Sequence, residues 1–190
     1  MHLFPLFNAH TDLAHAMWKK SLCKGDIAID ATCGAGKDST VIAALLQAAG
    51  GGTLQMMDIQ QSAIDKSREA LKSVETPSVT LSFHLGCHTH FPDITPKLIV
   101  YNLGYLPGGD KSLTTTAVNT LQSVKRATEI LSNQGVISII CYPGHNPGAI
   151  EEIALSEFLE KLPPDRWSVS YTQWKNRKKS PSLFLIQKNL

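Results

Sequence analysis

The feature that most constrains the fold is a regular alternation of short apolar runs with longer amphipathic segments. The runs have the length of buried strands, and the segments carry apolar residues at helical spacing. The predicted helices cover residues 9–22, 37–49, 60–74, 114–131 and 147–162, and the predicted strands cover 27–32, 53–58, 78–84, 97–103, 135–142, 167–174 and 182–188. Because strands alternate with helices, the sequence predicts an α/β, Rossmann-like fold: a seven-stranded, mostly parallel sheet with an antiparallel C-terminal hairpin and helices on both faces. The trailing hairpin is typical of the methyltransferase variant of this plan rather than the dehydrogenase one.

Composition narrows the class of protein. The 190 residues are 43% hydrophobic and 18% charged, which predicts one domain over residues 1–190 with a substantial core. A net charge of +2 excludes a strongly basic, histone-like binder but leaves room for a local basic patch. No apolar run approaches the roughly 18 residues of a membrane span, and the N-terminus does not resemble a signal peptide. The four cysteines are widely spaced without a CxxC pair, so a reduced, cytoplasmic location is expected.

The glycine-rich turn after the first predicted strand is the most informative motif. Residues 29–38 read Ile-Asp-Ala-Thr-Cys-Gly-Ala-Gly-Lys-Asp, in which a strand ends, two glycines follow and a helix begins. Gly34 and Gly36 allow the backbone to approach a ligand closely, and the helix N-terminus presents free N–H groups. A phosphate-binding P-loop is excluded, because Ala31 and Asp38 stand where that motif requires Gly and Ser or Thr.

The acidic residues around this turn favour S-adenosylmethionine as the ligand. Ser39 replaces the third glycine of a dinucleotide-binding motif, and Asp30 would repel a pyrophosphate. S-adenosylmethionine instead carries a sulfonium and an amino group, which a nearby carboxylate attracts. Asp58 ends the second strand about 20 residues after the turn, where a carboxylate can accept both ribose hydroxyls. The alternative interpretation is a structural turn with a solvated aspartate.

Asn102, at the end of the fourth predicted strand, indicates the kind of acceptor. In an open α/β sheet the loop that leaves such a strand lies over the ligand crevice. Asn102 and Tyr105 loosely match the Asn-Pro-Pro-Tyr arrangement of amino-group methyltransferases, with Leu103 and Gly104 in place of the prolines. In that arrangement the Asn side chain accepts hydrogen bonds from the target amine and the aromatic ring stacks on a flat base. The alternative is a glycine-rich turn with an asparagine in the core.

Five segments carry a resemblance to a known family. They are DATCGAGKDS (30–39), MDIQ (57–60), NLGYLPGGDKS (102–112), CYPGH (141–145) and the Asn-x4-Pro-x-Leu-Phe run (176–184). Together they resemble the YtqB-type family, which is often labelled an rRNA methylase family and includes MnmM-type tRNA wobble-uridine methyltransferases. The resemblance implies a class I fold, S-adenosylmethionine as cofactor, and N-methylation of 5-aminomethyl(-2-thio)uridine at the tRNA wobble position. The chain departs from the family pattern at Ser180-Pro181, where paired prolines are usual.

The resemblance also implies roles for individual residues. It implies that the methionine part of the cofactor is held near Asp30, Gly34 and Gly36, and its ribose by Asp58. It implies adenine contacts from Cys87 and His88, which follow the third strand. The implied cofactor-binding residues are Asp30, Thr32, Gly34, Gly36, Asp38, Asp58, Gln60, Cys87, His88 and Asn102. The implied catalytic residues at the transfer site are Asn102, Tyr105, Tyr142 and His145.

The turn between the last two predicted strands is a candidate RNA-binding surface. It carries four positive charges in five residues and follows Trp174. Such a run is as often a plain solvated face as a contact to phosphates. Together with the family resemblance, the basic run predicts tRNA as the partner, bound at its anticodon region. A chain of this size without a separate RNA-binding domain is compatible with a homodimer. The candidate RNA-binding residues are Lys111, Lys175, Asn176, Arg177, Lys178 and Lys179.

No metal site is predicted. Residues 84–90 contain three histidines and a cysteine, but zinc sites usually draw ligands from two separated segments. These side chains are expected to be structural or to contact the ligand. Cys33 and Cys141 are candidates for an attacking thiolate, which carbon methylation of uracil requires and an amine acceptor does not. Both are therefore expected to pack as small apolar residues.

Overall fold

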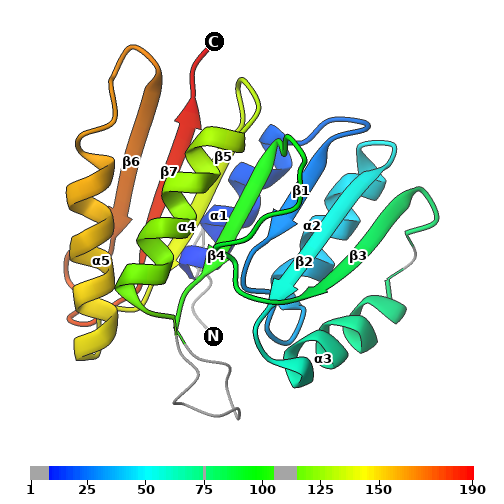
Figure 1. The fold of residues 1–190 in the computed structure, drawn as a ribbon, viewed down its shortest axis with the longest axis horizontal. Coiled ribbons are helices and arrows are strands. Elements are labelled where there is room, and N and C mark those ends of the chain that lie inside the picture. The colour runs from blue at the N-terminus through cyan, green and yellow to red at the C-terminus, as the bar shows by residue number, and fades with distance from the viewer. Residues whose placement is uncertain (1–8, 75, 105–114) are drawn as a thin grey trace.

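A computed structural model describes residues 9–74, 76–104 and 115–190 (Figure 1). The helices are α1 (His10–Ser21), α2 (Lys37–Ala48), α3 (Gln61–Lys72), α4 (Ala117–Ile130) and α5 (Asn146–Leu159). The strands are β1 (Ile27–Asp30), β2 (Gly52–Asp58), β3 (Val79–Leu85), β4 (Leu98–Asn102), β5 (Val136–Cys141), β6 (Trp167–Gln173) and β7 (Ser182–Lys188). The predicted order of elements is confirmed, and the predicted bounds differ only at the ends. None of the helices described is both long and apolar enough to cross a membrane.

The strands form one sheet in the order β3-β2-β1-β4-β5-β7-β6. The five strands from β3 to β5 in this order run parallel, whereas β7 pairs antiparallel with both β5 and β6. This arrangement confirms the predicted fold class. Because the chain moves outward from β1 to β3 and then returns to β4, the order reverses next to β1, and ligands of open α/β sheets bind at such a reversal.

Alternate side chains along the strands build two apolar cores, one on each face of the sheet. On one face, Trp18 and Leu46 of α1 and α2 pack with Leu98 of β4. On the other face, Val124 of α4 packs with Ile99, the next residue of the same strand. Helices α1, α2 and α3 therefore cover one face and α4 and α5 the other (Figure 1).

The turn that leaves β1 requires glycine at one position in particular. Gly36 is the N-cap of α2 and has φ +80°, in the left-handed region. A Cβ at this position would lie 2.8 Å from the Cα of Ser67 in α3, closer than packed atoms can approach. Gly36 thus lets α2 and α3 pack closely beside the turn.

Candidate active site

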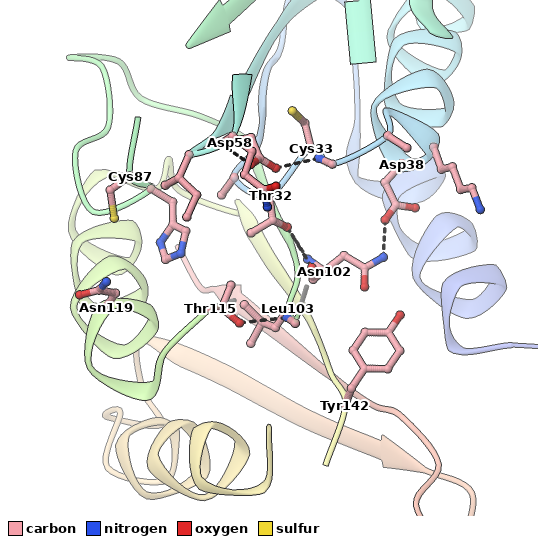
Figure 2. A pocket seen from close by; sticks show the side chains of 18 of the residues that line it. Thr32, Cys33, Asp38, Asp58, Cys87, Asn102, Leu103, Thr115, Asn119 and Tyr142 are labelled. Carbon is pink, nitrogen blue, oxygen red and sulfur yellow. Dashed lines mark hydrogen bonds between the residues drawn. The ribbon is translucent and has the colours of Figure 1, made fainter. Parts of the chain in front are cut away.

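A cavity of about 980 Å³ opens at the carboxyl edge of the parallel strands (Figure 2). Its wall is built from the loops after β1, β2, β3, β4 and β5, with α1 and the start of α4 at its sides. Most of the predicted site residues lie on this wall: Thr32, Gly34, Asp38, Asp58, Gln60, Cys87, His88, Asn102, Tyr142 and His145. Two further candidates, Tyr105 and Lys111, lie outside the described residues.

The carboxylate of Asp58 is held at the end of β2 by two backbone donors. The Gly34 N–H donates to Oδ2 at 3.0 Å, and the Gln60 N–H donates to Oδ1 at 2.9 Å. Each carboxylate oxygen can accept a second hydrogen bond, so both keep an acceptor position for a ligand in the cavity. This geometry suits a diol such as a ribose.

Asp30 lies behind the turn rather than on the cavity wall. Its side chain is 1% exposed and accepts hydrogen bonds from Ser39 Oγ at 2.5 Å and from the Thr32 N–H at 3.3 Å. Burial, helped by the negative charge of Asp38, raises the pKa of Asp30 to about 7. Neither Asp30 nor Gly36 is among the residues of the cavity wall, and their contacts with the cofactor stay predictions. Asp30 braces the turn from inside, and Gly36, which is also absent from the wall, serves the packing of α2.

Asn102 is fixed at the end of β4 by hydrogen bonds to the turn after β1 and to α2. Its N–H donates to Thr32 Oγ1 at 2.8 Å, and that hydroxyl donates back to the Asn102 carbonyl at 3.2 Å. The side-chain Nδ2 donates to Asp38 Oδ2 at 2.9 Å, as Figure 2 shows. An amide whose nitrogen is engaged in this way presents Oδ1 as an acceptor. The position of Asn102 on the cavity wall was predictable from the sequence, whereas its hydrogen bond to Asp38 was not.

Tyr142 and His145 follow β5 on the opposite side of the cavity from α3. The Tyr142 ring faces Asn102 (Figure 2). Burial and the charge of Asp38 raise the pKa of Tyr142, although a hydrogen bond from the Asn102 side chain opposes the shift, so the phenol stays protonated at neutral pH. His145 caps α5, and its Nδ1 accepts from the Gly148 N–H at 3.2 Å. In the neutral ring the proton is therefore on Nε2, which can donate a hydrogen bond to a ligand.

His88 lies in the connection between β3 and β4 and is 7% exposed. Burial lowers its pKa to about 4, so the ring is neutral at physiological pH. The ring meets Tyr101 edge-on, with 5.9 Å between centroids. A neutral, fixed ring beside Cys87 is compatible with an uncharged aromatic ligand on this side of the cavity.

A hydrogen-bonded stem joins the end of β4 to the start of α4. The Gly104 N–H donates to Thr115 Oγ1 at 2.9 Å, and the Thr115 N–H donates to the Gly104 carbonyl at 3.2 Å. Thr115 Oγ1 and Thr120 Oγ1 both donate to the carboxylate of Glu151 in α5, at 3.1 and 2.5 Å. Glu151 is 3% exposed, and burial raises its pKa. This stem fixes where the chain leaves and re-enters the site.

Several wall residues have no counterpart among the predicted ones. They include Thr11 and His15 on α1, Lys37 and Lys66 on α2 and α3, and Thr115 and Asn119 near α4. Thr11 and His15 share one face of α1, since they are four residues apart. That spacing was the available signal, but it does not reveal that this face meets the end of β4.

The cysteines and histidines form no metal centre among the residues that the structure describes, where no group of three or more potential ligands is assembled. All four cysteines are free. Cys33 and Cys141 are buried, and desolvation raises the pKa of each thiol. Both pack into the apolar cores, and a thiol with a raised pKa is a poor nucleophile at neutral pH.

The basic turn, residues 175–179, is exposed and adjoins the loop that follows β5. The Arg177 guanidinium lies over the Trp174 ring, 4.6 Å from its centroid. A Cβ built at Gly144 would lie 3.5 Å from Cβ of Lys179. Because Tyr142 and His145 flank Gly144 in the same loop, the basic turn lies next to the mouth of the cavity.

The sheet order, the antiparallel pairing of β7 and a cavity at the carboxyl edge of the parallel strands define the class I methyltransferase fold. Two proteins of this fold match nearly the whole chain. One, described as "putative rRNA-methylase" from Clostridium thermocellum, has a TM-score of 0.87 and 30% identity, covering 96% of this chain and 98% of its own. The other, described as a "putative methyltransferase" from Streptococcus mutans in complex with SAH, has a TM-score of 0.82 and 28% identity, covering 96% and 99%.

Sequence comparison specifies the family. Residues 54–188 match the model of a family described as "Putative rRNA methylase", and the chain belongs to this family. A relative from Arabidopsis thaliana, the chloroplastic tRNA (mnm(5)s(2)U34)-methyltransferase, is 38% identical over 191 residues, covering 94% of this chain and 69% of the relative. The family resemblance of the sequence motifs is thereby confirmed.

Proposed function

We propose that the chain is an S-adenosylmethionine-dependent N-methyltransferase that methylates the aminomethyl group of 5-aminomethyl(-2-thio)uridine at the tRNA wobble position. The observation that carries the proposal is the Asn102 amide, whose Nδ2 is engaged by Asp38 while the residue lines the cavity. Its Oδ1 can accept an N–H from an amine. The name of the Arabidopsis thaliana relative supports the same acceptor, and the SAH complex of the Streptococcus mutans protein supports the cofactor.

The residues present fit S-adenosylmethionine. Asp58 keeps acceptor positions for the ribose hydroxyls, and the Gly34 turn brings backbone close to the cavity beside it. His88 and Cys87 lie beyond Asp58 for the adenine, and Asp38 offers a carboxylate to a cationic group. When bound, the cofactor supplies a methyl group on a positively charged sulfur.

The chain's own contribution to methyl transfer is positioning. An amine must present its lone pair in line with the bond to be broken, and holding the reactants in that geometry supplies much of the rate. Asn102 Oδ1 orients the amine by accepting one N–H, and the Tyr142 phenol, which stays protonated, borders the same space. The incoming ammonium must also lose a proton. Solvent takes this proton before transfer, because the neutral His145 ring, whose Nδ1 accepts from the Gly148 N–H, already carries a proton on Nε2 and can only donate from there.

We further propose that tRNA reaches the site across the basic turn, with Lys175, Arg177, Lys178 and Lys179 contacting phosphates and Asn176 beside them. The turn adjoins the loop of Tyr142 and His145, so RNA bound there would lie close to the cavity. Five further points stay predictions of this proposal. They are recognition of the anticodon region, an RNA contact from Lys111, a homodimer, a single domain over residues 1–190 and a cytoplasmic location.

A methyl-transfer assay with labelled S-adenosylmethionine tests the proposal. The acceptor is bulk tRNA from cells that lack the enzyme, followed by nucleoside mass spectrometry. We expect a mass gain of one methyl on the aminomethyl-uridine with the wild type and a strongly reduced gain with Asn102→Ala. Methyl transfer to ribosomal RNA or to a small amine instead of tRNA would contradict the proposed acceptor. Tight cofactor binding without transfer to any RNA would contradict an enzymatic role.

A further inference from the structure

We propose that His15 of α1 is a positioning residue for methyl transfer, which acts through Asp38 to fix the orientation of the Asn102 amide. The inference rests on the proposed function for the identity of the acceptor. It extends that function, because it assigns a role to a helix outside the strand-end motifs.

The three side chains form a continuous chain of hydrogen bonds along the cavity wall. His15 Nε2 lies 2.8 Å from Asp38 Oδ1, and Asn102 Nδ2 donates to Asp38 Oδ2 at 2.9 Å. The side chains of His15 and Asp38 are 27% and 11% exposed, so solvent screens their contact only in part. One carboxylate thus joins α1, α2 and the end of β4.

His15 is itself held in place by the core. Its ring packs on that of Trp18, one turn further along α1, with 4.6 Å between centroids and 53° between planes. Trp18 is fully buried against α2 and the sheet. The imidazole therefore presents Nε2 to Asp38 from a fixed support, and Nε2–H can donate in both the neutral and the protonated ring.

The orientation of the Asn102 amide decides what it can do. Oδ1 accepts an N–H, whereas Nδ2 only donates, so a flipped amide would turn a donor toward an amine. The Asp38 carboxylate, which only accepts when ionised, selects the orientation with Nδ2 turned away from the acceptor. A carboxylate held on one side alone could swing away from Asn102, and the His15 donor restrains it from the other side.

Asp38 lies among acidic side chains, where a second hydrogen-bond donor to its carboxylate matters. Asp38 lies close enough to Asp30 to raise that residue's pKa, and close enough to Tyr142 to raise the pKa of its phenol. Asp58 adds further negative charge around Asp30. Among these acidic neighbours, the N–H of His15 gives the Asp38 carboxylate a second donor beside the Asn102 amide.

The test compares His15→Ala and His15→Gln with Ala16→Gln, a control at the exposed neighbouring position of α1. We expect His15→Ala to lower kcat for tRNA by about tenfold to a hundredfold, the cost of a misplaced reacting group, while the affinity for SAH stays within about twofold of wild type. Gln places an amide nitrogen near the position of Nε2, so His15→Gln should recover most of the lost kcat. Melting temperatures establish that each variant is folded.

A spectroscopic measurement separates this inference from the proposed function. In ¹⁵N-labelled protein the Asn102 side-chain NH₂ signal, assigned through its loss in Asn102→Asp, should shift and exchange faster in His15→Ala but not in Ala16→Gln. If wild type lacks amine methylation, the proposed function fails, and this signal still decides whether the relay exists. An unchanged signal and kcat in His15→Ala would overturn the relay. A folded His15→Gln as slow as His15→Ala would overturn it too, because the imidazole would then be needed for more than its N–H.

Discussion

The N–H of Gly34 donates to Oδ2 of Asp58 at 3.0 Å, which joins the turn after β1 to the end of β2. The two motifs that the sequence indicates for cofactor binding are therefore one structural unit. A change at either residue should therefore disturb both the turn and the carboxylate, which the proposed function assigns to the cofactor.

Substitution at Asp58 and at Asn102 should affect different steps. Asp58→Ala removes the ribose acceptors and the partner of the Gly34 N–H, so we expect the affinity for SAH to fall by about tenfold to a hundredfold, as for loss of hydrogen bonds to a charged group. Asn102→Ala should leave SAH affinity nearly unchanged and lower kcat instead. Calorimetric titration with SAH and the transfer assay measure the two effects. Equal losses of affinity in both variants would contradict this division of roles.

Asp30 should make stability depend on pH in an unusual direction. Its pKa rises from 3.8 to about 7 in the folded protein, mainly through burial, so the folded state binds its proton more tightly than the unfolded state does. Stability contributed by this residue therefore decreases as pH rises from about 4 to about 7. Asp30→Asn should lack this decrease, so its stability relative to wild type should increase across that range. Urea unfolding at several pH values measures the difference, and a difference independent of pH would refute the prediction.

Glu151 should matter for stability although it is absent from the cavity wall. Glu151→Ala leaves the hydroxyls of Thr115 and Thr120 without their acceptor in a buried place. We expect a loss of about 1–3 kcal/mol in the free energy of unfolding, the cost of unsatisfied buried polar groups. Glu151→Gln keeps an acceptor oxygen and should lose less, because it also avoids the burial of a charge that raises the pKa of Glu151. Urea unfolding of both variants tests this, with Glu157→Ala on an exposed face of α5 as control.

The basic turn should affect tRNA binding without affecting the chemistry at the cavity. Replacing Lys175, Lys178 and Lys179 by Gln should raise KM for tRNA. It should also reduce the slope of the logarithm of tRNA affinity against the logarithm of salt concentration, by about one unit for each phosphate that the turn no longer neutralises. SAH affinity should not change. Lys72→Gln, an exposed lysine at the end of α3, is the control. Unchanged KM and salt dependence would show that RNA binds elsewhere.

Much of the site was predictable because it follows strand ends. The alternation of elements predicts a parallel sheet, and in such a sheet the carboxyl ends of the strands meet at one edge, which brings Asp58 and Asn102 to the same cavity. Asp30 is not on the cavity wall because its side chain turns toward Ser39, and the sequence does not encode on which side of the turn a strand's last residue points. His15 was missed because its contact with Asp38 depends on how α1 crosses α2, which local periodicity does not determine.

The stem between Gly104 and Thr115 has a consequence for how such a protein can diversify. The Gly104 N–H donates to the Thr115 hydroxyl and the Thr115 N–H donates to the Gly104 carbonyl, which holds the end of β4 against the start of α4, while the buried carboxylate of Glu151 holds Thr115. Residues inserted, deleted or exchanged between the two positions need not displace Asn102 or α4. A chain with a different sequence between these two positions can therefore keep the contact between Asn102 and Asp38.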